Sequence, residues 1–304
     1  MKLKTKDLLT LNELNKKELE RIIENAIKLK KDLKVGICKP LLKNKTLAMI
    51  FQKPSTRTRV SFETGMFQLG GHALNLSSNE LQLARGETIE DTSKTLSRYV
   101  DIIMARVYSH EEIEILAKNS IVPVINGLSD TFHPCQILAD LMTIKEKKKK
   151  FAGLKLAWVG DGNNVCNSMI FGCAKTGISI SIATPRGYEP ITNVVKESKR
   201  LIDVELTHDP ILAVKDADVV VTDTFVSIHH QTTDRIKDFL PKFQVNPSLM
   251  KKAKDDAIFL HCLPAKRGHE VTSSVIDGSQ SAVWDEAENR LHTQKSLMVA
   301  MLRV

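Results

Sequence analysis

Short apolar segments alternate with amphipathic helical segments along almost the whole sequence, and this alternation limits the possible folds more than any other feature. In the first half the apolar segments span residues 46–51, 73–76, 101–105 and 122–125. In the second half they span residues 155–159, 178–183, 204–206, 218–222 and 257–261. Regular alternation of strands and helices is typical of parallel sheets covered by helices. The sequence therefore predicts an α/β fold.

A predicted helix connects the two series of strands. It opens at His133-Pro134 and ends in the lysine-rich run 145–150. A chain of 304 residues also has the length of about two domains. We predict two tandem doubly wound parallel-sheet domains joined by this helix, with residues 1–134 in the first and 149–283 in the second. A C-terminal helix over 284–304 is expected to pack back on the first domain.

Composition excludes several classes of protein but does not decide which kind of partner the chain binds. With 42% hydrophobic and 26% charged residues, the chain is neither collagen-like, disordered nor membrane-spanning. The net charge of +8 suits an anionic partner, either nucleic acid or a small phosphate. The lysine run contains no aromatic residues and is more typical of a solvated helix end than of a nucleic-acid contact.

The first residues and the cysteines bear on the cellular compartment. The lysine-rich start leads into an amphipathic segment rather than a hydrophobic one, so we expect no secretory signal and a cytoplasmic protein. The five cysteines are an odd number and form no CxxC pair. This pattern argues against a disulfide framework and against a structural zinc site.

One polar motif follows the first apolar segment. Gln52-Lys53-Pro54 leads into Ser55-Thr56-Arg57-Thr58-Arg59, after which apolar residues recur at helical spacing. A helix N-terminus offers free N–H groups and the positive end of the helix dipole, and hydroxyls and guanidinium groups add further donors. The motif predicts a phosphate site. The alternative is an ordinary helix N-cap followed by solvent-facing arginines, which would have the same sequence.

Polar residues also stand at the ends of other predicted strands, where ligands of open α/β sheets bind. Arg106 follows the third segment, and His133 and Gln136 lie three apart at the start of the linking helix. In the second half, Gly160-Asp161-Gly162-Asn163-Asn164 lacks the third glycine of a dinucleotide fingerprint and favours a small polar ligand over nicotinamide. Asp223 and Cys262 end two later segments.

Taken in order, four motifs resemble those of the ornithine carbamoyltransferases over essentially the whole chain. They are Ser-Thr-Arg-Thr-Arg at 55–59, His-Pro-Cys-Gln at 133–136, Asp-Gly-Asn-Asn at 161–164 and His-Cys-Leu-Pro-Ala at 261–265. The first two are shared with the wider carbamoyltransferase family, whereas the last two are closer to the ornithine branch. Aspartate carbamoyltransferases usually carry Pro-Leu-Pro where this chain has Cys-Leu-Pro.

The resemblance implies an enzyme that transfers the carbamoyl group of carbamoyl phosphate to the δ-amino group of L-ornithine, giving L-citrulline and phosphate. It implies no cofactor and no metal, and a homo-oligomer that is a trimer or a multiple of one. The residues that it implies for carbamoyl phosphate are Ser55, Thr56, Arg57, Thr58, Gln82 from a neighbouring subunit, Arg106, His133, Gln136, Cys262, Leu263 and Arg290. Of these, Arg106, His133 and Cys262 are expected at the reacting atoms. The residues that it implies for ornithine are Asn164, Asp223, Ser227 and Ile228.

One loop departs from the family pattern. Where the family usually has Ser-Met-Gly, this chain has Ser227-Ile228-His229. Loss of the glycine bears on ornithine affinity and leaves putrescine or another amine as an alternative substrate. A basic nucleic-acid-binding protein without catalytic activity is the alternative from another class, and a steep salt dependence of binding would identify it.

Overall fold

The computed structural model describes residues 3–79, 81–226 and 234–302. The chain divides into two compact units. Residues 1–142 and 288–304 form unit 1, and residues 143–287 form unit 2. Within the described ranges, no helix is both long enough and apolar enough to cross a bilayer.

Unit 1 is built on a parallel sheet of four strands in the order β2-β1-β3-β4. The strands are β1 (Thr46–Phe51), β2 (His72–Ser77), β3 (Ile102–Arg106) and β4 (Val124–Leu128). β3 and β4 are buried along their whole length, whereas the edge strand β2 is half exposed. Strands buried on both faces read as continuous apolar runs, which is why the sequence indicates them clearly.

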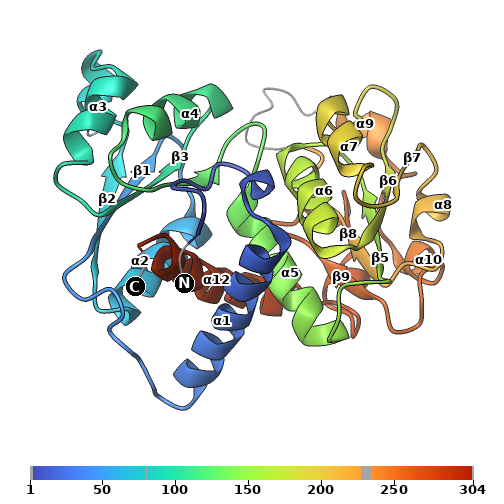
Figure 1. The fold of residues 1–304 in the computed structure, drawn as a ribbon. Coiled ribbons are helices and arrows are strands. Elements are labelled where there is room, and N and C mark those ends of the chain that lie inside the picture. The colour runs from blue at the N-terminus through green and yellow to red at the C-terminus, as the bar shows by residue number, and fades with distance from the viewer. Residues whose placement is uncertain (1–2, 80, 227–233, 303–304) are drawn as a thin grey trace. The chain divides into compact units, whose positions relative to one another are not determined.

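Helices cover both faces of this sheet, as Figure 1 shows. α3 (Ile89–Leu96) and α4 (His110–Asn119) lie together on one face, where the Ser93 hydroxyl donates to the carbonyl of Leu116. α1 (Lys16–Lys34), α2 (Thr56–Gln68) and α12 (Val283–Met301) lie on the other. The Ser296 hydroxyl of α12 donates to the carbonyl of Ile22 in α1 at 2.7 Å. The unit also contains the short helices η1 (Leu11–Glu13) and η2 (Gln82–Arg85).

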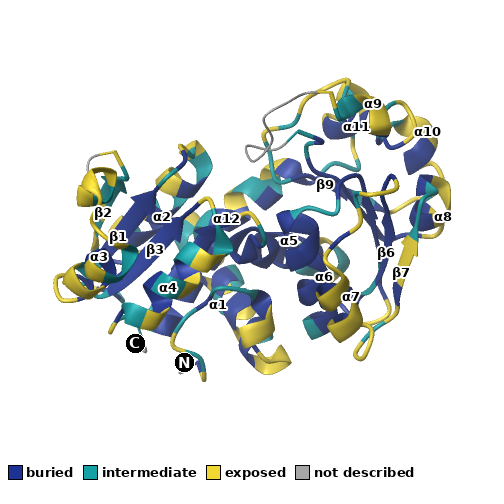
Figure 2. Cartoon of the chain, turned by 90° about the horizontal axis from the view of Figure 1, so that it is seen from above, coloured by how far each residue is buried: buried dark blue, intermediate teal, exposed yellow. Residues whose placement is uncertain are grey.

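Unit 2 is built on a parallel sheet of five strands in the order β7-β6-β5-β8-β9. They are β5 (Lys155–Val159), β6 (Ser179–Ala183), β7 (Val204–Thr207), β8 (Val219–Val221) and β9 (Ile258–Leu260). Its helices are α6 (Asn164–Thr176), α7 (Thr192–Ser198), α8 (Pro210–Val214), α9 (Ile236–Phe239), α10 (Pro247–Met250) and α11 (Ser273–Ile276). Figure 2 shows buried residues along the central strands of both sheets and exposed residues on the outer helices.

The predicted fold class, two tandem parallel-sheet α/β domains with a linking helix and a C-terminal helix, is confirmed. The linking helix is α5 (Pro134–Lys148), which crosses the boundary between the units. Helix α12 crosses it a second time, because residues from Glu288 onward belong to unit 1.

Candidate functional site

Each sheet has a switch point where helices leave neighbouring strands toward opposite faces. In unit 1 this point lies at the carboxyl ends of β1 and β3, and in unit 2 at those of β5 and β8. Ligands of doubly wound sheets bind outside the strand ends at such points. The predicted motifs that follow these strands are therefore in the expected positions.

The segment after β1 forms the start of α2. Ser55 is the N-cap, and its hydroxyl accepts a hydrogen bond from the N–H of Thr58 at 3.3 Å. The other N–H groups of the first turn have no partner within the helix, and the helix dipole adds positive potential there. Arg57 is half-buried at this turn, whereas Arg59 is exposed and pairs with Glu63 at 3.3 Å. Of the two arginines, Arg57 is the one placed to meet an anion at the helix start.

Arg106 is the last residue of β3 and lies in register with Phe51 of β1. Its carbonyl accepts a hydrogen bond from the N–H of Gln52 at 3.0 Å, which ties the segment after β1 to the end of β3. Lys53, in that segment, is also buried. Burial and the charge of Arg106 lower the pKa of Lys53. Sequence reasoning did not select Lys53, although it stands two residues before the motif.

His133 is buried immediately before the first residue of α5. Burial holds the pKa of His133 well below its ordinary value, and the charges of Arg290, Arg106 and Arg57 lower it further. The imidazole is thus neutral at physiological pH. The three arginines come from α12, β3 and α2, so positive charge from three separate elements acts on this ring.

Arg290 of α12 joins α5 to α2 inside unit 1. Its Nη1 donates to Oε1 of Gln136 at 2.7 Å, and its Nη2 donates to Oγ1 of Thr58 at 3.2 Å. All three side chains are buried. The structure therefore brings Thr58, Gln136 and Arg290 together in unit 1, close to His133, as the resemblance implies.

Gln82 lies apart from this group, in η2, with an exposed side chain. Among the described residues, no hydrogen bond joins its side chain to the buried cluster. A hollow of about 960 Å³ opens beside Ser55 and Thr56, between α2 and the edge strand β2. Phe67 and Val60 line this hollow, and these residues are 79% and 55% exposed.

In unit 2, Asn163 and Asp223 bring together the strand ends of β5 and β8. Asn163 is the N-cap of α6, where its Oδ1 accepts from the N–H groups of Val165 and Cys166. Its Nδ2 donates to Oδ2 of Asp223 at 2.7 Å. Asn164, which the resemblance assigns to ornithine, is the buried first residue of the helix. Sequence reasoning missed the role of Asn163, because both asparagines fit the motif equally well.

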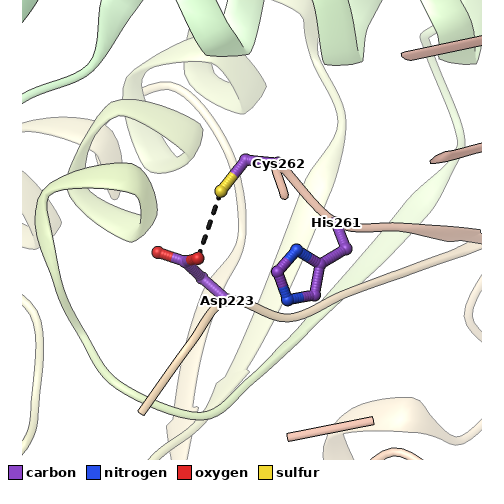
Figure 3. A group of neighbouring side chains, drawn as sticks. All are labelled: Asp223, His261 and Cys262. Atoms are coloured by element: carbon purple, nitrogen blue, oxygen red, sulfur yellow. Dashed lines mark hydrogen bonds between the residues drawn. The ribbon is translucent and has the colours of Figure 1, made fainter. Parts of the chain in front are cut away.

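Cys262 and Asp223 face each other, as Figure 3 shows. The Cys262 thiol donates to Oδ1 of Asp223 at 3.1 Å, and the N–H of Thr224 donates to the same oxygen at 2.7 Å. Leu263, the next residue, has a φ of 56°, which a residue with a side chain seldom adopts. Backbone strain of this kind clusters at functional sites.

The ligand atoms of Asp223, His261 and Cys262 lie within 4.8 Å of one another. A cation would need a free nitrogen of His261. However, its Nδ1 accepts from the N–H of Leu263 at 2.9 Å, and its Nε2 faces Oε1 of Glu270 at 3.1 Å. Because the backbone N–H can only donate, Nε2 carries the proton and points it at the carboxylate. His261 thus holds the chain segment, and this arrangement does not present it as a metal ligand.

An ion pair between a buried aspartate and a partly buried arginine lies beside the turn after β5. Arg235 donates through Nη2 to Oδ2 of Asp161 at 2.7 Å, and its guanidinium also stacks on Tyr188 and Phe239. Burial raises the pKa of Asp161 to about 6, while Arg235 opposes this rise. A carboxyl group with this pKa is mostly ionised at neutral pH, in agreement with its short ion pair to Arg235. Nothing in the sequence pattern had indicated Arg235.

Two residues assigned to ornithine, Ser227 and Ile228, lie outside the described residues, as does the neighbouring His229.

Comparison with protein families gives two matches that together span most of the chain. Residues 6–146 match the family described as "Aspartate/ornithine carbamoyltransferase, carbamoyl-P binding domain". Residues 152–301 match "Aspartate/ornithine carbamoyltransferase, Asp/Orn binding domain".

Similar proteins carry the corresponding name. The chain is 63% identical to an ornithine carbamoyltransferase of Cenarchaeum symbiosum, over 99% of either chain. It is 55% identical to one of Pyrococcus horikoshii, over 99% of this chain and 96% of the relative. Among solved structures, the ornithine carbamoyltransferase of Pyrococcus furiosus matches with a TM-score of 0.93 and 54% identity, over 98% of this chain and 97% of the other.

Proposed function

Because the chain belongs to the aspartate/ornithine carbamoyltransferase family, we propose that it transfers the carbamoyl group of carbamoyl phosphate to the δ-amino group of L-ornithine. The products are L-citrulline and phosphate. The observation that carries this proposal is the buried hydrogen-bonded cluster of Thr58, Gln136 and Arg290 beside His133 at the start of α2. Thr58, His133 and Gln136 lie in the range that matches a carbamoyl-phosphate-binding domain, whereas Arg290 lies in the range that matches the Asp/Orn-binding domain.

Unit 1 holds carbamoyl phosphate in this proposal. The phosphate lies at the start of α2, where backbone N–H groups and guanidinium groups meet it. The binding residues are Ser55, Thr56, Arg57, Thr58, Arg106, His133, Gln136 and Arg290, with Gln82 supplied by a neighbouring subunit. Cys262 and Leu263 of unit 2 complete the set at the carbamoyl end.

His133 acts as a neutral hydrogen-bond donor. Its lowered pKa keeps the ring uncharged, so one ring N–H polarises the carbamoyl oxygen together with Arg106 and Thr58. The amine lone pair attacks the carbonyl carbon, and the bond from that carbon to the phosphate oxygen breaks. The arginines stabilise the charge on the departing phosphate, and the amine proton leaves with it.

Unit 2 holds ornithine. Asp223 accepts from the α-ammonium group, and Asn164 donates to the α-carboxylate, with Ser227 and Ile228 in the same set. Cys262 orients and desolvates the amine and forms no covalent bond, because the attacking atom is the substrate's own nitrogen. The reaction requires no metal or cofactor, since the leaving group departs as a stable anion.

A second copy of the chain completes the site in the proposed homotrimer, or a multiple of it. Phe67 and Val60 expose apolar surface around the hollow beside Ser55 and Thr56, where a neighbouring subunit would cover it. Gln82 then reaches the site of the next copy. A cytoplasmic location and a place in arginine metabolism are part of the same proposal.

The experiment uses carbamoyl phosphate labelled with ¹³C at the carbonyl and a panel of amines that contains ornithine, putrescine, lysine and aspartate. We expect a ureido carbon signal with ornithine, accompanied by one equivalent of phosphate. Absence of a ureido product with every amine would overturn the proposal. Salt-dependent nucleic-acid binding in the same sample would favour the non-enzymatic alternative.

A further inference from the structure

Asp140 is a buried carboxylate in unit 1 to which none of the roles above is assigned. It lies on α5, one helical turn after Gln136, and is 1% exposed. Its Oδ1 accepts a hydrogen bond from Nε2 of Gln136 at 2.8 Å. Burying a carboxylate costs free energy unless hydrogen bonds satisfy it. The hydrogen bonds that Asp140 makes therefore indicate its role.

The contacts of Gln136 fix the orientation of its amide. A carboxylate accepts hydrogen bonds, whereas a guanidinium can only donate them. Nε2 therefore faces Asp140, and Oε1 accepts from Nη1 of Arg290 at 2.7 Å. Rotating the amide by half a turn would place acceptor against acceptor and donor against donor. Asp140 thus selects the orientation that Arg290 requires.

The same direction of donation continues to Thr58. Nη2 of Arg290 donates to the Thr58 hydroxyl oxygen at 3.2 Å. Because that oxygen accepts from Arg290, the hydroxyl hydrogen points away from the guanidinium and is left to donate. The series Asp140, Gln136, Arg290, Thr58 runs from α5 through α12 to the first turn of α2.

We propose that Asp140 is a positioning residue for carbamoyl phosphate: through the Gln136 amide it orients the Arg290 guanidinium and the Thr58 hydroxyl toward the phosphate and carbamoyl groups. It does not touch the substrate. Donors held in place before the anion arrives need no reorganisation during the reaction, which strengthens their effect. The inference rests on the proposed function for its substrate.

The first test measures phosphate affinity by calorimetry, so that it does not depend on turnover. In Asp140→Ala, we expect the Kd for inorganic phosphate and the KM for carbamoyl phosphate to rise at least tenfold. In Asp140→Asn, the side-chain oxygen still accepts from Gln136, and we expect both values within threefold of the wild type. Equal weakening in the two variants, or no weakening in Asp140→Ala, would overturn the proposal.

Asp101→Asn is the matched control. Asp101 also accepts two hydrogen bonds, from Nζ of Lys45 at 2.7 Å and from the N–H of Thr46 at 2.8 Å. It lies at the end of the sheet opposite to the strand ends that carry the site. We expect it to lower the melting temperature without changing phosphate affinity. A matching loss of phosphate affinity in this control would show that general destabilisation explains the effect of Asp140→Ala.

A double-mutant cycle separates positioning from packing. In a Gln136→Leu background the series of hydrogen bonds from Asp140 to Thr58 (the relay) is already broken. Adding Asp140→Ala there should change phosphate affinity less than twofold. A full, additive loss would mean that Asp140 acts independently of Gln136 and would overturn the proposal. If the wild type binds phosphate but makes no citrulline, the proposed function fails while the phosphate titrations still decide the role of Asp140.

Discussion

At the scale of single residues, Arg57 and Arg59 differ although the sequence presents them alike. Arg57 contributes to the positive potential at His133, whereas Arg59 is exposed and pairs with Glu63. We expect Arg57→Ala to lower kcat/KM for carbamoyl phosphate by roughly 10- to 150-fold, because a hydrogen bond to a charged group is worth about 1.5–3 kcal/mol. Steady-state kinetics measures this loss. Arg59→Ala is the control, and we expect its kcat/KM to lie within threefold of the wild-type value. A near-normal Arg57→Ala enzyme would remove Arg57 from the phosphate site.

His133 also makes stability depend on pH. Its pKa is lowered in the folded state, chiefly by burial, so the unfolded state binds a proton first as the pH falls. The stability that it contributes is present above its unfolded pKa of about 6.5 and is lost below it. Between pH 7 and pH 5 this amounts to at most about 2 kcal/mol in the free energy of unfolding. In His133→Asn we expect urea titrations to show a smaller difference between the two pH values; an unchanged difference would contradict a neutral His133.

At the scale of elements, Arg235 links the segment before α9 to the turn after β5. Replacing it with alanine leaves the buried Asp161 carboxylate without its partner, which costs about 3–5 kcal/mol in unfolding free energy. The pKa of Asp161 would rise above its present value of about 6, so the folded state would hold a proton that the unfolded state releases. We therefore expect Arg235→Ala to be less stable at pH 8 than at pH 5, relative to wild type.

Arg267 provides the control for that experiment. It pairs with Asp277 at 2.9 Å, but both side chains are about half exposed. An exposed pair contributes about 0–1 kcal/mol. Thermal or urea denaturation of Arg267→Ala should therefore match the wild type. A loss in Arg235→Ala no larger than that of the control, or one independent of pH, would show that the Asp161 pair is not the source of stability.

The buried central strands could be predicted from the sequence, whereas the short helices, which depend on contacts with the rest of the fold, could not. The expected strands 46–51 and 155–159 coincide with β1 and β5, because central parallel strands are continuous apolar runs. The short helices α9, α10 and α11 carry too few residues to show a periodicity.

The candidate site also contains both residues that could be predicted from the sequence and residues that could not. Arg106 and Asp223 could be predicted because Arg106 ends one strand and Asp223 closely follows another, and ligands bind at strand ends. The relay through Asp140 could not be predicted, because Gln136 and Arg290 are 154 residues apart in the chain and only the fold brings them together. The same holds for the pairing of Asp161 with Arg235, 74 residues apart.

At the scale of the whole molecule, the proposed oligomer allows chains with different defects to complement each other. A site needs Arg57 from its own chain and Gln82 from a neighbour. When the impaired Arg57→Ala and Gln82→Ala chains are mixed in equal amounts and reassembled as trimers, about one site in four recovers both residues. We expect about a quarter of wild-type activity from the mixture, and clearly less from either variant alone, with at most about a tenth from Arg57→Ala. A fully active monomer at high dilution, or no recovery on mixing, would argue against the shared site.

The choice of amine tests the central claim most directly, because ornithine and putrescine differ only by the α-carboxylate. Putrescine keeps an ammonium group for Asp223 but leaves Asn164 without the carboxylate that it pairs with, and an unsatisfied polar group of this kind can cost several orders of magnitude in kcat/KM. The measurement supplies equimolar ornithine and putrescine with limiting ¹³C-labelled carbamoyl phosphate and compares the two ureido products. The account predicts citrulline in at least about 100-fold excess over N-carbamoylputrescine. An excess of N-carbamoylputrescine would contradict it, and the Ile228→Met, His229→Gly variant would then show whether the altered loop is the cause.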